Sequence, residues 1–201
     1  SYVHFHSSPA TNRQSIQNVK DILMVLAGYQ IQCRVYMVPL LKIQQKIIAE
    51  APNKLWVILF RRAMIHIASQ IADEIGAPAL ISGESVGQVA SQTLSNIRAT
   101  SEVADRPILR PLCGMNKEDI VNLGKKIGTY EISIEPYEDC CSFFVPVHPE
   151  TKANLNHVIK VESAIDFGDL FDEAMENTTI STIQHPDYTK EELKILEEVD
   201  D

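Results

Sequence analysis

The stretch ALISGESVGQVASQ, residues 79–92, separates two interpretations of the chain. It starts with an apolar run typical of a buried strand, and the letters GESVG at 83–87 spell G-x-S-x-G, the motif of a hydrolase nucleophile elbow. A helix is expected over residues 86–99, which gives the motif the strand–turn–helix context of such an elbow. Short motifs with two glycines also arise in ordinary strand-to-helix turns, so the rest of the chain has to decide.

Two explanations of Ser85 are open at this point. As a nucleophile it needs an acid and a histidine downstream, for which His148, His157 and His185 are candidates, but no oxyanion segment of the HGGG type lies upstream. In the simpler explanation, Gly83 allows a tight turn with close approach, and Ser85 caps the helix that follows. A serine hydrolase is therefore an alternative that rests on this motif alone.

Predicted strands and helices alternate on both sides of this stretch. Strands are expected at 2–6, 31–38, 78–82 and 106–112, and helices at 12–29, 40–51, 53–76, 86–99 and 116–128. The last of these helices has Asn116 as N-cap and Gly128 as its stop. Such alternation predicts an α/β fold, a parallel-sheet sandwich with right-handed crossovers. We expect one domain over residues 1–201, with a less distinctive acidic helical tail from about 162.

Polar segments follow three of the predicted strands: HFHSS, SGESVGQ and RPLCGMN. Because ligands of open parallel sheets bind beyond the carboxyl ends of the strands, these segments predict one shared site at that edge.

Composition limits the possible partners and the compartment. The 201 residues carry a net charge of −9, so the overall field does not favour nucleic acid, although a local basic groove is compatible with it. The strongest apolar run, LWVILF at 55–60, is the length of a core element, and no signal peptide is visible, so we expect no membrane partner. The four cysteines form neither a disulfide framework nor zinc-binding pairs, which predicts a reducing cytoplasm and no metal site.

Five ordered segments resemble one family, the tRNA 4-thiouridine synthetases (ThiI, tRNA sulfurtransferases), in their carboxyl-terminal catalytic domain. The segments are VHFHSSPATN, ILFRRAMIHIASQIA, SGESVGQVASQTLSNI, PILRPLCGMNKEDIVNLGKKIGTYEISI and PYEDCCSFFVPVHPETKA. The resemblance extends from about residue 2 to 160. It implies the PP-loop ATPase fold of the adenine-nucleotide alpha-hydrolase type, and it is far more specific than one G-x-S-x-G.

The resemblance also implies an activity. Members of the family use ATP, with Mg²⁺, to adenylate O4 of a tRNA uridine, and a cysteine persulfide then delivers sulfur while AMP leaves. Some members supply sulfur for the thiamine thiazole. The implied partners are tRNA, contacted mainly through regions absent from this chain, and a cysteine desulfurase as sulfur donor.

Five positions match ATP-contacting residues of the family: His4, Phe5, Arg61, Gly83 and Gln92. Gly83 suits a base or ribose pressed against a strand end, because it has no Cβ. Arg61 can bind a phosphate group through its guanidinium fork. The alternative is that Arg61 is a solvated charge on the helix surface, as expected for its neighbour Arg62. Gln92 can read a base edge or cap a surface, and His4 and Phe5 can equally be ordinary strand residues.

The same resemblance makes Cys140 the persulfide-accepting cysteine, with Cys141 as a near-equal candidate. Both lie in a segment with flanking prolines that we expect to be a loop, although the neighbouring acids should raise the thiol pKa. The alternative is that both are buried small hydrophobic residues. Cys33 lies within a predicted strand and is expected in the core, whereas Cys113 is only a possible lining residue.

One departure from the family limits the prediction. PP-loop enzymes carry S-G-G-x-D-S between the first strand and the first helix, where backbone amides bind phosphate, and this sequence has no such stretch. Either the sequence is a piece of a longer protein that starts just after the loop and its helix, or the protein has lost its phosphate site. The start within a predicted strand favours the first explanation, with the first strand of the domain missing, and under both we expect the chain to be inactive alone. An open sheet edge, and with it a homodimer, is the expected consequence.

Two alternatives to the sulfurtransferase stay open. Another PP-loop ATP pyrophosphatase would not need Cys140, so a serine at this position would leave its activity intact. A non-catalytic adenine-nucleotide-binding module would bind AMP without supporting thiolation of tRNA.

Overall fold

Strand β2 (Gln32–Pro39) is the centre of the larger sheet. The computed structural model describes residues 1–11, 13–136, 144, 148–185 and 187. In it β2 pairs in parallel with β1 (Tyr2–His6) and antiparallel with β5 (Thr179–Gln184). These pairings leave one edge of β1 without a strand partner in the described part of the chain.

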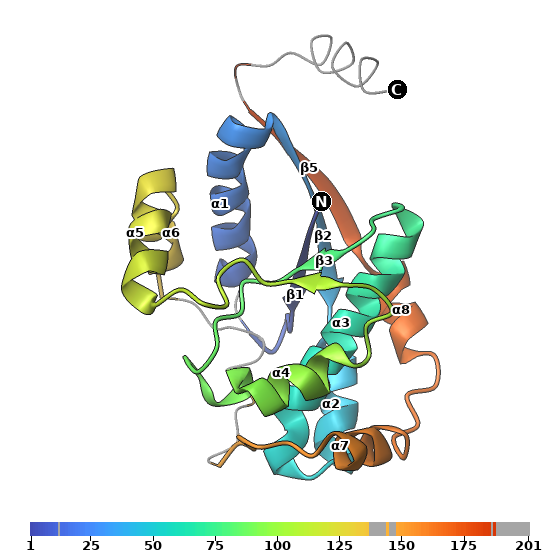
Figure 1. The fold of residues 1–201 in the computed structure, drawn as a ribbon. Coiled ribbons are helices and arrows are strands. Elements are labelled where there is room, and N and C mark those ends of the chain that lie inside the picture. Colours follow the sequence, from blue (N-terminus) through green and yellow to red (C-terminus); the bar gives the residue numbers. More distant parts are fainter. Residues whose placement is uncertain (12, 137–143, 145–147, 186, 188–201) are drawn as a thin grey trace.

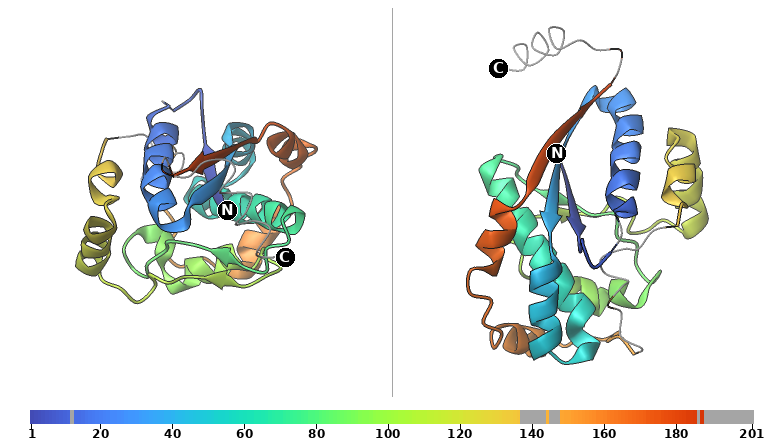
Figure 2. Two further views of the ribbon diagram at one scale, coloured as in Figure 1. Left: turned by 90° about the horizontal axis from the view of Figure 1, so that it is seen from above. Right: turned by 180° about the vertical axis from the view of Figure 1, so that it is seen from behind.

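The side chains of β2 alternate between two cores, as the period of a strand requires. Val35 and Met37 pack with Leu23 of α1 (Gln14–Gln30) on one face. Tyr36 and Val38 join a larger cluster on the other face, which α2 (Leu41–Glu50) and α3 (Trp56–Glu74) cover. Figures 1 and 2 show α1 and α3 on opposite sides of this sheet, so the expected α/β sandwich is confirmed.

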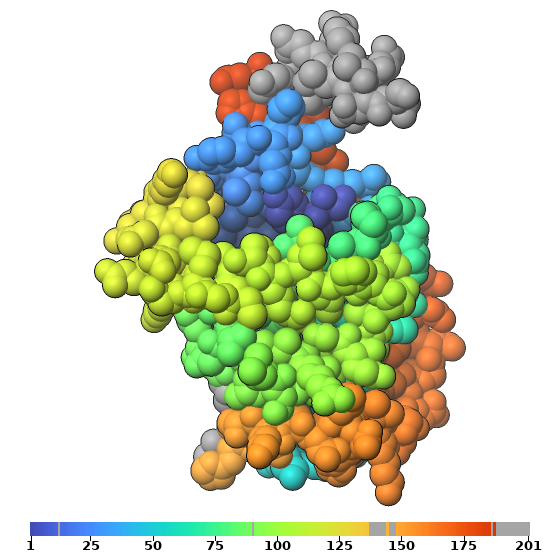
Figure 3. Space-filling view, viewed as in Figure 1, coloured from blue at the N-terminus to red at the C-terminus, as the bar shows by residue number. Residues whose placement is uncertain are grey.

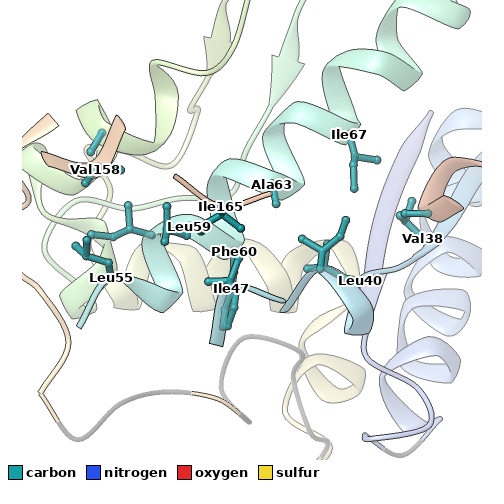
Figure 4. Close-up of a cluster of buried hydrophobic side chains, with 14 of the residues drawn as sticks. Val38, Leu40, Ile47, Leu55, Leu59, Phe60, Ala63, Ile67, Val158 and Ile165 are labelled. Carbon is teal, nitrogen blue, oxygen red and sulfur yellow. The ribbon is translucent and has the colours of Figure 1, made fainter. Parts of the chain in front are cut away.

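Helix α3, which follows the short 3-10 helix Asn53–Leu55, supplies most of the larger core. Figure 4 shows the side chains that meet there, among them Leu59, Phe60, Ala63 and Ile67 of α3. The segment Asn53–Glu74 is long and apolar enough to cross a membrane by length and composition, but 61% of its apolar window is buried inside the fold. Its hydropathy is thus accounted for by core packing.

The remaining two strands form a separate small sheet. β3 (Leu80–Ile81) and β4 (Ile108–Leu109) pair in parallel with each other only. The parallel pairs β1–β2 and β3–β4 agree with the predicted topology. A cavity lies between β1 and β3, and residues of both sheets line it.

The predicted helix over residues 86–99 is wrong in its first half. A 3-10 helix (Ala90–Gln92) follows Gly87, whose φ of 79° is incompatible with an α-helix, and α4 spans only Leu94–Ser101. Thr93 is the N-cap, since its side chain accepts a hydrogen bond from the backbone N–H of Asn96 at 3.2 Å. Ser85 therefore caps no helix.

The next helix confirms its predicted boundaries. In α5 (Lys117–Ile127) the Asn116 side chain accepts from the N–H of Asp119, and Gly128 ends the helix in the left-handed conformation. The short α6 (Tyr130–Ser133) then packs against α1, and Figure 1 shows this helical pair beside α1.

The tail contains a strand that the predicted acidic helical tail did not include. Helix α7 (Leu155–Glu162) ends where that tail was expected to begin, and α8 (Leu170–Glu176) lies within it. The segment after them, TISTIQ, forms β5, because alternating β-branched residues suit the free edge of β2. The antiparallel direction of β5 departs from the all-parallel sheet that was expected.

Candidate functional site

A cavity of about 780 Å³ lies between β1, β3 and α3. Its walls come from Val3 and Phe5 of β1 and from Leu80, Ile81 and Ile108 of the small sheet. Its floor is one side of α3, contributed by small and apolar residues: Met64, Ile65, Ala68, Ile71, Ala72 and Ile75. Figure 3 shows the atoms of the N-terminal strand, in dark blue, exposed at the surface between α1 and the yellow-green band that follows β4.

The cavity has a polar part at the carboxyl ends of β1 and β3. Phe5 lies near the end of β1, Ser82 and Glu84 follow β3, and Arg61 stands one turn into α3. All four residues line the cavity. Of the residues predicted for the site, the structure brings Phe5 and Arg61 together at this edge.

A buried carboxylate joins two arginines beside the cavity. Glu84 is only 8% exposed, and one of its carboxylate oxygens accepts a hydrogen bond from Nη1 of Arg61. Its other oxygen accepts from Nε of Arg110 at 2.7 Å. Two cations around one anion leave this group with a formal charge of +1, which favours an anionic ligand.

Arg62, next to Arg61, has a different environment, and the expectation of a solvated charge there is wrong. Its side chain is 3% exposed, and its guanidinium donates to both oxygens of Glu162 and to Oε2 of Glu102 at 2.6–3.0 Å. Another N–H donates to the carbonyl of Ala99. Arg62 thus ties α3 to α4 and α7, because a turn of 100° per residue points it away from the cavity side of α3.

The environment of Ser85 does not support a nucleophile. The residue is 5% exposed, and its hydroxyl donates to the backbone carbonyl of Met115 at 3.1 Å rather than to a histidine. The backbone N–H of Val86 donates to the carbonyl of Cys113. Ser85 and Val86 thus fix the segment after β3 against the segment after β4, and the hydrolase interpretation is wrong.

The other three predicted nucleotide residues, His4, Gly83 and Gln92, are not among the residues that line the cavity. Gly83 lies between two lining residues, and a Cβ added to it would meet no heavy atom within 4 Å. His4 lies in β1 opposite Met37 of β2. Gln92 holds the turn after β3, since its backbone carbonyl accepts from the N–H of Gly87 at 3.0 Å.

Two of the four cysteines can be placed. Cys33 is buried in β2, where burial raises the pKa of its thiol, so the predicted core position is confirmed. Cys113 is partly exposed and lies outside the cavity lining. Cys140 and Cys141 lie outside the described residues.

The described residues nearest to these two cysteines contact α3 and α4. The ring of Phe144 lies edge-on to Phe60, with 6.2 Å between centroids, and Phe60 directly precedes Arg61. Asn96 is fully buried, donates to the carbonyl of Glu150 at 2.7 Å and accepts from the N–H of Ala153 at 3.0 Å. Residues 150–153 are thereby fixed to α4, on the same side of the fold as Arg62.

Residues 1–167 match the family described as thiamine biosynthesis protein (ThiI). The chain belongs to this family. The resemblance carried by the five sequence segments is thus confirmed, and so is the α/β fold class.

Curated relatives and one solved structure agree with this family. The chain is 44% identical over 181 residues to a protein of Acetivibrio thermocellus named probable tRNA sulfurtransferase, covering 90% of this chain and 46% of that protein. It is 43% identical over 183 residues to one of the same name from Clostridium acetobutylicum, covering 91% and 48%. The crystal structure of a 4-thiouridine synthetase–RNA complex with bound ATP matches at 41% identity, with a TM-score of 0.86, over 90% of this chain and 48% of that one. The chain spans about half the length of these relatives.

Sequence reasoning missed Glu84 and Arg110 as residues of the site. Glu84 is the second residue of the GESVG motif, and Arg110 follows β4 in RPILRPL. A carboxylate and an arginine placed directly after two parallel strands were the signal, because the carboxyl ends of adjacent strands bring such residues together.

Proposed function

We propose that this chain is the greater part of the ATP-binding and sulfur-transferring domain of a tRNA sulfurtransferase that makes 4-thiouridine. The observation that carries the proposal is the match, at 41% identity over 90% of the chain, to a 4-thiouridine synthetase complexed with RNA and ATP. A cationic cluster and an aromatic ring beside one cavity give the ATP an appropriate environment. The compartment that suits this work on tRNA is the cytoplasm.

The ATP site that we propose is the polar part of the cavity. Arg61 is the phosphate ligand, because its guanidinium lines the cavity and its fork matches phosphate oxygens. Phe5 supplies an apolar surface for the adenosine, and Gly83 leaves open space where a side chain would intrude. His4 and Gln92 complete the site by supporting β1 and the turn after β3.

Mg²⁺ would accompany the ATP phosphates rather than a protein cluster. Within the described ranges, no three His, Cys, Asp or Glu side chains gather in a way that could hold a metal ion. The roles proposed for this chain belong to its arginines and its backbone. They do not depend on a metal ligand from the described residues.

The proposed chemistry has three steps. The uridine O4 attacks the α-phosphorus of ATP and pyrophosphate leaves, so that O4 becomes part of a good leaving group. The terminal sulfur of a cysteine persulfide then attacks C4, and AMP leaves with O4. A second thiol then attacks the sulfur of the cysteine side chain and forms a disulfide with it. This attack breaks the S–S bond and releases 4-thiouridine.

We assign the persulfide to Cys140, with Cys141 as its near-equal candidate. The resemblance of the segment PYEDCCSFFVPVHPETKA to the family supports this assignment. The sulfur reaches Cys140 from a cysteine desulfurase. The test is thiolation of unmodified tRNA by the longer protein that contains this chain, with Cys140→Ser and Cys141→Ser as variants. If both variants still form 4-thiouridine, the assignment is overturned.

A further part of the proposal is that one more strand belongs in the cavity. The facing edges of β1 and β3 have no strand partner in the described part of the chain, the floor on α3 is apolar, and Ile81 on the wall is 75% exposed. A parallel strand there would join the two sheets into one. The curated relatives are about twice as long as this chain, so they have the residues to supply it.

Two measurements test this incompleteness. We expect the chain alone, given ATP, Mg²⁺ and unmodified tRNA, to release no AMP at an ordinary enzymatic rate, and rapid release would refute the idea. We also expect the open edges to promote association into a homodimer. A strictly monomeric chain in sedimentation, at high concentration, would count against that consequence.

A further inference from the structure

Ser101, Arg110, Glu84 and Arg61 form a continuous line of hydrogen bonds, here named the Glu84 relay. Nη2 of Arg110 donates to Oγ of Ser101 at 2.6 Å, and Nε of Arg110 donates to Glu84 at 2.7 Å. Glu84 in turn accepts from Nη1 of Arg61. The relay starts at the end of α4, passes the end of β4 and the segment after β3, and ends on α3 at the cavity.

The two arginines of the relay differ in how many donors they use. All three nitrogens of Arg110 donate, since its Nη1 also reaches the carbonyl of Ile108 at 3.3 Å. Arg61 uses Nη1 alone, and among the described residues its Nε and Nη2 have no hydrogen-bond partner. The Arg61 side chain is 23% exposed and lines the cavity. Arg110 is thus a fixed support, whereas Arg61 keeps free donors beside a space large enough for a ligand.

From this asymmetry we propose that Glu84 is a positioning residue, which holds Arg61 so that its free donors meet a phosphate group in the cavity. This rests on the proposed ATP site and deepens it, because Glu84 acts through Arg61. Glu84 itself is held by Arg110, so the arginine fork is fixed before a ligand arrives. A preorganised donor loses less side-chain entropy on binding than a freely rotating one.

The charges of the relay fit the same role. A single carboxylate shared by two guanidinium groups offsets one positive charge and leaves the other for an anion. Loss of the Glu84 charge would leave Arg61 unrestrained and Arg110 without its carboxylate partner. The expected effect is weaker anion binding. A Glu84 that merely competed with the ligand for Arg61 would give the opposite result, namely tighter binding after its removal.

The chain offers a matched control on the next residue of α3. Glu162 accepts from Arg62 as Glu84 accepts from Arg61, but Arg62 is buried away from the cavity and its partners occupy all its nitrogens. Like Glu84→Gln, Glu162→Gln neutralises a carboxylate that is paired with an arginine of α3, but among the described residues Glu162 pairs with Arg62 alone, whereas Glu84 is shared by Arg61 and Arg110. Glu162→Gln is expected to change stability without changing how Arg61 responds to an anion.

The experiment is a titration of the 201-residue chain with inorganic pyrophosphate, followed through the arginine Nε–H signals in ¹H–¹⁵N NMR spectra. The Arg61 signal is assigned by its loss in Arg61→Gln. In the unsubstituted chain this signal should shift, and in Glu84→Gln the apparent Kd should rise about tenfold, as expected for one charge-assisted hydrogen bond. In Glu162→Gln the Kd should stay within about twofold, because the sites are independent.

Each other outcome decides against the proposal. An unchanged or lower Kd in Glu84→Gln overturns it, as does an Arg61 signal that pyrophosphate does not move in the unsubstituted chain. Should the amide spectrum show that Glu84→Gln is unfolded, Glu84→Asp takes its place. Its shorter side chain cannot reach both arginines in the same geometry, so a rise in Kd supports the relay and an unchanged Kd overturns it.

A second titration with ATP separates this proposal from the proposed function. ATP binding that weakens in Glu84→Gln alongside pyrophosphate binding supports both. If pyrophosphate binding depends on Glu84 but the chain does not bind ATP, the result supports the relay and overturns the ATP site. If the Kd for ATP is the same in Glu84→Gln as in the unsubstituted chain, the relay is overturned and the proposed ATP site is retained.

Discussion

Helix α3 places two adjacent arginines in two very different regions. Arg62 faces the closed region, where α3, α4 and α7 meet and where carboxylates and a backbone carbonyl satisfy its guanidinium. Arg61 faces the open region, where β1 and β3 stand apart around a cavity of about 780 Å³. In the closed region each polar group of Arg62 serves the fold, and in the open region donors are left for a ligand.

The comparison shows how one helix serves both stability and function. A buried charge is tolerated only when it is fully paired, so Arg62 is expected to be sensitive to any change in its partners. A partly exposed charge with spare donors costs the fold little and remains available. The same division holds for the apolar residues, since Ile67 is fully buried on one side while Ile81 is 75% exposed on the other.

The largest expected effect is on stability, from the buried arginine. Arg62→Gln should lower the free energy of unfolding by about 3–5 kcal/mol, because it leaves Glu162 and Glu102 without their partner. Arg61→Gln should lower it by about 1 kcal/mol or less, since a partly exposed ion pair contributes little. Urea denaturation of the two variants measures both values. Equal losses of stability would contradict the difference between the closed region of Arg62 and the open region of Arg61.

The apolar residues of the two regions should differ in the same way. Ile67→Ala is expected to cost about 2–5 kcal/mol, because it removes buried methyl groups and leaves a cavity in the core. Ile81→Ser should change stability by about 0.5 kcal/mol at most, as for an exposed position. Thermal unfolding followed by circular dichroism compares them. A large loss from Ile81→Ser would mean that the open wall is already covered in solution.

A third effect separates stability from binding at Gly83. Gly83→Ala should leave stability within about 0.5 kcal/mol, since its Cβ meets nothing within 4 Å. Its affinity for ATP should fall by about tenfold, equal to about 1.4 kcal/mol, if adenosine lies against this residue. Gly128→Ala is the matched control, because its φ of 82° should cost about 1–2 kcal/mol of stability without affecting ATP. Isothermal titration that gives Gly83→Ala full affinity would move the adenosine away from β3.

The smallest expected effect is a pH dependence at the carboxyl end of β1. Burial lowers the pKa of His6 in the folded chain. The unfolded chain therefore takes up the proton first as the pH falls below about 6.5, so the contribution of His6 is complete above this pH and is lost toward the lowered pKa. Urea denaturation at several pH values should show a weaker loss between about pH 7 and 5 in His6→Gln. If the free energy of unfolding depends on pH in the same way in both proteins, the lowered pKa of His6 is contradicted.

Local patterns were sufficient for most of the elements and part of the site. The capping signals at Asn116 and Gly128 were correct because they act within one turn of helix. The helix expected from Val86 was wrong because Gly87 adopts a positive φ that the apolar spacing does not reveal. β5 was missed because a short polar edge strand is decided by its partner, here β2, rather than by its own hydrophobicity.

The sequence by itself determined the α/β class, the family and the placing of Phe5 and Arg61 at one edge of the fold. Periodicity indicates the class, because it depends on neighbours along the chain, whereas the family and the choice of Phe5 and Arg61 are implied by the resemblance of five ordered segments. Only the tertiary structure decided that Glu84 holds Arg61, that Arg62 is buried and that Ser85 is a structural hydroxyl. Each of these depends on a partner between 23 and 100 residues away, and a hydrogen bond over that separation is set by how the elements pack.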